Sequence, residues 1–520
     1  MKKSFVLLLT LTILFTGTAI YAQGELLKEK DQVHYTETVI YGDKSVVDGV
    51  VFEADTSYKY HLFWNTKYQI GETPKEETQY QFYEIAHFEN SYNSSGSLYF
   101  TPNLRDIESD PTIFLADKEY DGLMGAYQEL YQNTEPGAQN TAVVYMKAYS
   151  DFYTFDIELH LPTVDGVMGN PYYEFGYLRE KELKEELANY EKNGGENKER
   201  IKEYKSYLYL LDTLQEYFKI PVLEKEVLSI GISVDENGLV DGWSESDVQG
   251  GMSTGNMDFP PVPNVEGADH YEFNMNATFV DGECYFTFNP YTANGNLVDL
   301  SYIPDGFGIY RFTYDAKATR VDIDSLEMVY PIDLSRRIHE IRSDASGKNL
   351  LLFSEDNEQV YMDIIDRDTM TLVDTFVLRS REISYDKWTY DDFFVVSGEK
   401  LEVYELGENG RYTKALSVSV DAIKEKIDTN RYDRELLQWN AVFDWNGETL
   451  LFADRMIFMD AEGWSSVYTC DLYVAAVDET GLVYFGEYVS SLNASDVYNI
   501  NHMNCIFNPD KLNPIQIRWE

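Results

Sequence analysis

The chain has 520 residues, with 90 Asp or Glu against 42 Lys or Arg, so its formal net charge is -48 at pH 7. This acidity excludes nucleic acid as a partner, because nucleic-acid binding needs Lys and Arg to neutralise phosphates, and it disfavours anionic lipid surfaces. The acidic residues are spread along the chain, which favours a solubilising surface; attraction of cations or basic peptides is the alternative.

The first 22 residues have the layout of a secretory signal peptide. Lys2 and Lys3 give a positive start, Phe5 to Ile20 form an apolar core, and Ala22-Gln23 is the expected cleavage point. The apolar run is about the shortest that spans a bilayer, so an uncleaved N-terminal anchor is the alternative. We expect a bacterial protein that is secreted or held at the cell surface, with membrane contact only through an uncleaved N-terminus.

Residues 23–221 are expected to form a β-rich N-terminal region that carries inserted helices. A short helix is expected over Glu119–Tyr131. Apolar residues recurring at three- and four-residue steps predict a helical hairpin over Leu178–Pro221, interrupted at 192–195. Runs rich in β-branched and aromatic residues predict strands at Thr36–Tyr41, Val46–Glu53, Tyr58–Trp64, Gln79–Tyr83, Ala142–Lys147 and Phe152–Leu161.

Residues 222–520 are predicted to form short strands separated by turns, and this region includes a Gly/Pro-rich loop at 248–267. Asn-Gly and Asp-Gly pairs, such as Asp281-Gly282 and Asn446-Gly447, supply the positive φ that tight hairpins need. The segment Asp344–Leu378 has the order turn, strand, strand, turn, strand, and the same order recurs from Asp391 and from Asp444. The spacing of about 45 to 60 residues is typical of β-propeller blades.

These repeats resemble the blades of YVTN-type and WD-repeat propellers through Gly347-Lys348, Asp366 and Thr369, and again through Gly447 and Asp478. The WD dipeptide is absent at the expected places, so the resemblance covers strand order and turn chemistry. The whole chain is also similar to a group of exported proteins of Firmicutes, through YGDKSVVDGV near the start and DETGLVYFGEYVSSL near the end. That similarity implies no particular activity.

The expected fold is therefore mainly β and propeller-like with inserted helices. One alternative is a single propeller of about six or seven blades over the mature chain. In that case the last strand, Ile515 to Trp519, pairs near the first. The other is a smaller C-terminal propeller over residues 222–520 that follows a β-rich N-terminal domain.

Three cysteines are too few for a disulfide-built scaffold. Cys284 lies in the apolar strand ECYFTF and is expected to be a buried thiol. Cys470 and Cys505 are candidates for a disulfide that tethers the last segment, since the exported location permits one. The spacing of the three does not match a metal site.

None of the candidate catalytic motifs has the secondary structure or residue spacing that its chemistry requires. Gly251-Met252-Ser253-Thr254-Gly255 fits G-x-S-x-G, but no helix is expected after it, as a nucleophile elbow requires. The seven histidines stand singly, without zinc-protease spacing. The acidic residues Asp363, Asp366, Asp368 and Asp391-Asp392 are interpreted as turn and strand-end residues, against a calcium site or a glycosidase pair.

We therefore expect a non-catalytic binding protein that acts outside the cytoplasm without a cofactor. Its partner is a protein, peptide or glycan of the cell envelope, bound by loops at one end of the propeller. A glycan-active hydrolase or lyase on the same scaffold is one alternative, since aromatic and acidic residues are plentiful. A membrane-anchored sensor ectodomain is the other.

Overall fold

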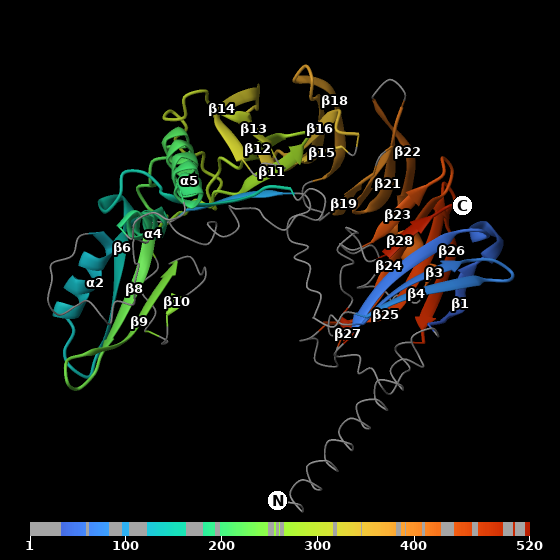
Figure 1. Cartoon of the computed structure of the whole chain (residues 1–520), viewed down its shortest axis with the longest axis horizontal. Helices are drawn as coiled ribbons and strands as arrows, with labels where there is room; N and C mark the ends of the chain where they lie inside the picture. The colour runs from blue at the N-terminus through green and yellow to red at the C-terminus, as the bar shows by residue number, and fades with distance from the viewer. Residues whose placement is uncertain are drawn as a thin grey trace, which may run out of the picture. The chain divides into compact units, whose positions relative to one another are not determined.

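The computed structural model describes residues 33–58, 62–82, 96–102, 122–162, 180–192, 198–247, 254–255, 259, 265–315, 320–344, 346–380, 386–390, 392–407, 411–427, 441–459, 466–491, 503–504 and 515–520. The chain divides into two compact units, which we describe separately (Figure 1). Unit 1 comprises Met1–Tyr92 with Glu382–Glu520, and unit 2 comprises Asn93–Arg381. The expected signal peptide with its Ala22-Gln23 cleavage point lies outside the described residues, as do Cys505 and the side chain of Cys470.

Unit 2 contains two four-stranded antiparallel meanders, in which consecutive strands lie side by side. This is the plan of a propeller blade, so the mainly β, blade-like fold expected from the repeats is confirmed. The first meander joins β11 (Met275–Val280), β12 (Glu283–Phe288), β13 (Gly308–Asp315) and β14 (Arg320–Pro331). The second joins β15 (Arg337–Ser343), β16 (Asn349–Glu355), β17 (Gln359–Asp366) and β18 (Thr371–Ser380).

The rest of unit 2 is a four-stranded sheet, a strand pair and helices. The sheet has the order β10-β9-β8-β6, and β5 pairs with β7. The predicted helical hairpin is present as α4 (Glu180–Lys192) and α5 (Lys198–Tyr217), and the shorter helix as α2 (Gly122–Gln132). The remaining elements are β5 (Ser97–Pro102), β6 (Gln139–Tyr145), η4 (Met146–Ala148), β7 (Phe155–His160), β8 (Val227–Val234), β9 (Val240–Asp247) and β10 (Thr254–Gly255).

Helix α5 and the segment that follows it are anchored on the β11–β14 sheet. Phe218 is fully buried, with its ring 4.9 Å from that of Tyr310. At the surface, the Tyr209 hydroxyl donates to Asp324 of β14 at 2.6 Å, and the Tyr217 hydroxyl donates to Asp305 of the β12–β13 connection at 2.5 Å. Aromatic packing inside and phenol–carboxylate bonds outside therefore fix the hairpin against the blade.

Unit 1 contains three more sheets. One is the meander β19-β20-β21-β22, and a second has the order β1-β26-β25-β24-β23. The third has the order β27-β2-β3-β4, with β28 also paired to β2. The elements are β1 (Tyr35–Gly42), η1 (Lys44–Val47), β2 (Val51–Tyr58), β3 (Leu62–Gln69), β4 (Lys75–Phe82), β19 (Asp386–Thr389), β20 (Phe393–Ser397), β21 (Lys400–Leu406), β22 (Tyr412–Ser419), α6 (Val420–Lys424), β23 (Val442–Trp445), β24 (Leu450–Met459), β25 (Ser466–Asp478), β26 (Gly481–Ser490), β27 (Met503–Asn504) and β28 (Ile515–Arg518).

The two ends of the chain meet in these sheets. The N-terminal strand β1 extends the C-terminal meander by pairing with β26, and the C-terminal strand β28 pairs with β2. The expected pairing of the last strand near the first is thus present. One predicted strand differs, because Lys44–Val47 forms a 3-10 turn capped by Asp43, and β2 begins only at Val51.

Many tyrosines lie in the core. Tyr68, Tyr285, Tyr404 and Tyr484 belong to the largest fully buried side chains. Their hydroxyls still find partners, as in the 2.8 Å contact between Tyr484 and Tyr488. A buried phenol keeps its ring in apolar surroundings and requires a partner for its hydroxyl, which these packed strands supply.

The pairing of β28 with β2 should carry a large part of the stability of unit 1. We predict that Ile515→Ala lowers the free energy of unfolding by about 2–5 kcal/mol, because Ile515 is 1% exposed and its removal leaves a cavity. Urea unfolding followed by tryptophan fluorescence measures this, since Trp64, Trp445 and Trp519 all report on unit 1. The control is Gln516→Ala on the other face of the same strand, and an equal loss in both variants would contradict the prediction.

Candidate functional site

The β11–β14 and β15–β18 sheets have two ends of different character. The short connections at 281–282, 344–348 and 367–370 share one end, because alternate strands run in opposite directions; we call it the turn end. The connections at 289–307, 332–336 and 356–358 share the opposite end, which we call the loop end. Each end is a candidate binding site, since binding residues concentrate in the loops of a rigid scaffold.

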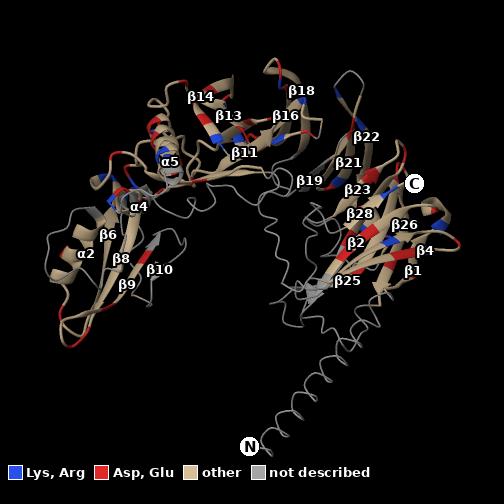
Figure 2. Cartoon of the chain, in the orientation of Figure 1, with Lys and Arg blue, Asp and Glu red and all other residues tan. Residues whose placement is uncertain are grey.

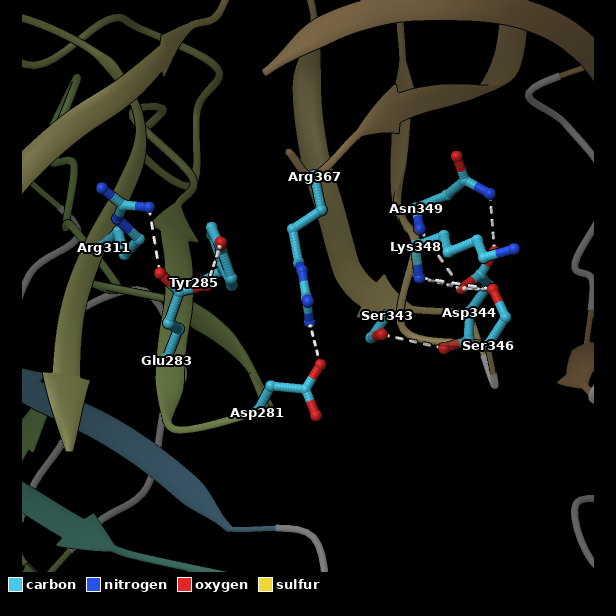
Figure 3. Close-up of polar contacts among 10 residues, drawn as sticks. All are labelled: Asp281, Glu283, Tyr285, Arg311, Ser343, Asp344, Ser346, Lys348, Asn349 and Arg367. Carbon is cyan, nitrogen blue, oxygen red and sulfur yellow. Dashed lines mark hydrogen bonds and ion pairs between the residues drawn. The ribbon is translucent and has the colours of Figure 1, made fainter. Parts of the chain in front are cut away.

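At the turn end, Asp344 organises the hairpin between β15 and β16 (Figure 3). Its carboxylate accepts hydrogen bonds from the Lys348 N–H at 3.0 Å, the Asn349 side chain at 2.7 Å and the Ser346 hydroxyl at 2.9 Å. The side chain is 2% exposed. Asp344 therefore supplies buried acceptors to its own turn and is closed to a ligand.

The turn end also joins the two sheets to each other. Arg367 donates to Asp281 across a distance of 2.8 Å (Figure 3). The Ser343 N–H donates to the Thr278 hydroxyl at 3.0 Å. Gly347 has a φ of +68°, and a Cβ there would lie 3.1 Å from the Val280 side chain. A larger residue would therefore meet both backbone strain and a close neighbour.

A charged ladder continues onto β12 and β13. Arg311 pairs with Glu283 at 3.0 Å and also with Glu327, and the Tyr285 hydroxyl donates to Glu283 at 2.6 Å (Figure 3). Burial, followed by the bond to Glu283, raises the pKa of Tyr285 to about 12. These charged and hydroxyl groups are hydrogen-bonded or paired with one another, so we interpret the turn end as the junction between blades.

The acidic residues considered as metal or glycosidase candidates are engaged in the same way. Asp363 accepts from Arg336 at 2.9 Å and from Thr375 at 2.6 Å, and Asp366 accepts from the hydroxyl and N–H of Thr369. The bonds from Thr369 hold the pKa of Asp366 below its usual value. Within the described ranges, no group of three or more His, Cys, Asp or Glu lies close enough to hold a metal ion.

The other motifs do not converge on one place. Thr254 and Gly255 of the G-x-S-x-G segment form the short strand β10, where a nucleophile elbow would need a helix; 251–253 lie outside the described residues. Cys284 is a free, fully buried thiol whose pKa burial raises well above its usual value, as expected for a packing residue.

The described histidines each have a local acidic or hydroxyl neighbour. His34, His270 and His339 contact Glu76, Glu272 and Glu355, and His160 contacts the Ser97 hydroxyl at 3.0 Å. These four contacts involve different elements. His61, His87 and His502 lie outside the described residues.

The loop end is built around the buried carboxylate of Asp269, which precedes β11. It accepts from the Thr292 hydroxyl at 2.6 Å, the Asn296 side chain at 2.9 Å and the Asn294 N–H at 3.1 Å. Burial raises the pKa of Asp269, but these hydrogen bonds outweigh it and leave the pKa below its usual value. One ionised side chain therefore fixes the first half of the 289–307 loop.

Two further contacts connect this loop to the next sheet. Tyr291 pairs with Leu297 within the loop through an isolated β-bridge, and its hydroxyl donates to the Leu334 carbonyl. Arg336 stacks on the ring of Tyr361, with its guanidinium carbon 4.0 Å from the ring centroid. The loops of two neighbouring sheets are thus held together.

Apolar side chains stand exposed on this ordered surface. Leu297 is 47% exposed, Leu334 is 38% exposed and Tyr302 is 51% exposed. We call Tyr291, Leu297 and Leu334 the loop-end patch, because the contacts of Tyr291 connect all three. These three residues were not predicted as site residues, because the exposure of a Leu in a loop has no local sequence signal.

Comparison with known proteins finds only distant structural similarity. No family model matches the sequence, and no curated protein matches it. Distant structural similarity is found with β-propeller proteins of known structure. A protein from Lactobacillus plantarum has 11% identity and a TM-score of 0.22, covering 52% of this chain and 84% of its own.

Two enzymes match at the same level. An oligogalacturonate lyase solved with manganese has 10% identity and a TM-score of 0.22, covering 51% of this chain and 62% of its own. A luciferin-regenerating enzyme has 9% identity and a TM-score of 0.19, covering 50% and 87%. Similarity this distant carries no chemistry over, so the fold rests on the strand pairing described above.

We predict that Asp269→Ala loosens the 289–307 loop without unfolding unit 2. Each hydrogen bond to a charged acceptor stabilises by about 1.5–3 kcal/mol, so losing several should raise amide exchange at Asn294 and Asn296 by tenfold or more. Hydrogen exchange resolved by residue measures this, with Asp366→Ala at the turn end as the control.

The same loop should respond to acid. A carboxylate whose pKa is lowered on folding stabilises above its unfolded pKa, and this stabilisation is lost as the pH falls through the folded pKa. The protection of the loop amides, relative to their intrinsic exchange rate at each pH, should therefore fall below about pH 4, where Asp begins to protonate. A protected loop in the Asp269→Ala variant would refute both expectations.

Proposed function

We propose that this is an exported, non-catalytic binding protein that holds its partner at the loop end of the β11–β18 sheets. The observation that carries the proposal is the loop-end patch of Tyr291, Leu297 and Leu334, which is exposed although its loops are fixed. Exposed apolar groups on a pre-ordered surface bind at a low entropic cost. Aromatic residues and Arg, both present here, are also enriched at the centres of protein interfaces.

The state of the acidic residues supports binding over catalysis. A glycosidase needs one carboxylic acid whose pKa is raised, so that it can protonate the leaving group. At the loop end, Asp269, Asp299, Asp333 and Asp356 all have pKa values below the usual one, because N–H and hydroxyl groups donate to them. These groups favour the ionised form and suit recognition. A glycan-active hydrolase or lyase is the alternative, and the assay below distinguishes it.

Export is part of the same proposal and rests on the N-terminal sequence. The positive start, the apolar core and Ala22-Gln23 support a cleaved signal peptide. In the described part of the chain, no helix has the length and apolarity needed to cross a membrane. N-terminal sequencing of the exported protein separates the two forms, because a start at Gln23 contradicts a membrane-anchored sensor.

We predict that a double variant, Leu297→Ser with Leu334→Ser, loses binding to an envelope component that the unmodified protein retains. The immobilised chain from Gln23 onward is exposed to fractionated envelope proteins and to a glycan array. Loss of the apolar contacts should reduce retention of that component at least tenfold, since each leucine that becomes buried on binding contributes about 1.5–3 kcal/mol.

The matched control is Leu239→Ser with Leu372→Ser, in the β8–β9 connection and at the turn end of β18, where the two side chains are 65% and 50% exposed. Equal retention by both double variants would refute binding at the loop end. Release of shortened glycans from the array would refute the non-catalytic assignment.

A further inference from the structure

We infer that the loop-end patch takes a basic peptide segment of a partner protein, one that presents Lys or Arg beside apolar side chains. This inference rests on the proposed function and names the chemistry of its partner. It follows from the charges that surround the patch, the hydrogen-bonding groups that it offers and the cations that are already engaged there.

Each exposed leucine of the patch lies beside an ionised aspartate. Asp299 is two residues after Leu297, and Asp333 directly precedes Leu334. Both occur in the same short motif, since Val298-Asp299-Leu300-Ser301 is repeated as Ile332-Asp333-Leu334-Ser335. The two copies differ in their leucine, because Leu300 packs against the core while Leu334 is exposed, so the exposed leucine of the 289–307 loop is Leu297, just before the motif.

Hydrogen bonds from serine keep both carboxylates charged. The Ser301 N–H donates to Asp299 at 2.9 Å, and the Ser335 N–H donates to Asp333 at 2.8 Å. The Ser301 hydroxyl and N–H lower the pKa of Asp299, and the Ser335 N–H and hydroxyl lower that of Asp333. Both carboxylates are therefore ionised at neutral pH.

The two nearby arginines contact groups other than these carboxylates. Arg336 pairs with Asp363 and stacks on Tyr361, and Arg337 lies over the ring of Tyr291. Among the residues that the structure describes, no Lys or Arg comes within ion-pair distance of Asp299 or Asp333. Neither carboxylate thus has a direct ion-pair partner among the described residues, although the nearby charge of Arg336 contributes to the lowered pKa of Asp333. A cationic segment of a partner can supply such a pair.

Both carboxylates are also anionic hydrogen-bond acceptors. A segment that brings N–H donors and positive charge complements such a surface, whereas an acidic segment is repelled by it. The net charge of -48 extends the attraction to longer range.

Two model peptides of equal length test the inference, one alternating Lys with Leu and the other alternating Glu with Leu. Fluorescence anisotropy should show binding of the Lys peptide, weakening as salt rises, and no binding of the Glu peptide. Asp299→Asn with Asp333→Asn should weaken the Lys peptide by roughly tenfold, because each exposed ion pair contributes up to about 1 kcal/mol.

The control for overall acidity is Asp235→Asn with Asp366→Asn. It removes the same two charges from turns in which Asp also accepts N–H bonds, but away from the loop end. Binding should stay within twofold of the unmodified protein. Equal weakening in both double variants would reduce the effect to net charge and overturn the inference, as would binding of the Glu peptide.

The same variants separate this inference from the proposed function. An envelope component whose retention needs Leu297 and Leu334, but not Asp299 and Asp333, leaves the binding function intact and overturns the basic partner. Retention that is indifferent to the leucines overturns both.

Discussion

The fold depends on how its chain reversals satisfy their backbone N–H groups. A small antiparallel sheet reverses direction after every strand, and each reversal leaves peptide groups without a ladder partner. Here aspartate carboxylates accept many of those N–H groups, as Asp344 does between β15 and β16 and Asp269 does for the 289–307 loop. Part of the acidity is therefore structural, because these carboxylates serve as hydrogen-bond acceptors for the turns that they occupy.

The same use of aspartate gives the two ends of the β11–β18 sheets their different roles. At the turn end, short reversals bring the sheets close enough for Arg367 to reach Asp281, so the charges there neutralise one another. At the loop end, longer connections place Asp299 and Asp333 where no described cation pairs with them. Figure 2 shows acidic and basic residues interspersed along the strands of both units, so the contrast lies in pairing and not in the density of charge.

Sequence patterns predicted most of the strands because their signals are local. Asp281-Gly282 and Gly447 have the positive φ that the Asp-Gly and Asn-Gly pairs imply. Strand β15 was missed, because a bulge between Ile338 and Glu340 breaks its alternation. Its buried residues Ile338 and Ile341 then stand three apart, a spacing that does not read as a strand.

The candidate site was beyond the reach of sequence because its contacts are long-range. Asp269 and Thr292 are 23 residues apart, and Tyr291 and Leu334 are 43 apart. The repeated Asp-Leu-Ser motif is visible in the sequence, but it has no meaning there until both copies are known to lie at the same end. Only the register of the meanders places them together.

A surface that presents anions and leucines on fixed loops explains why strong net acidity and binding are compatible. Dispersed negative charge keeps the chain soluble and repels other acidic molecules, so that it discriminates among partners before contact. In the complex that we propose, the exposed leucines supply short-range attraction to a segment that also neutralises Asp299 and Asp333. The same surface then combines charge, which opposes association between copies of the chain, with leucines that select for a complementary partner.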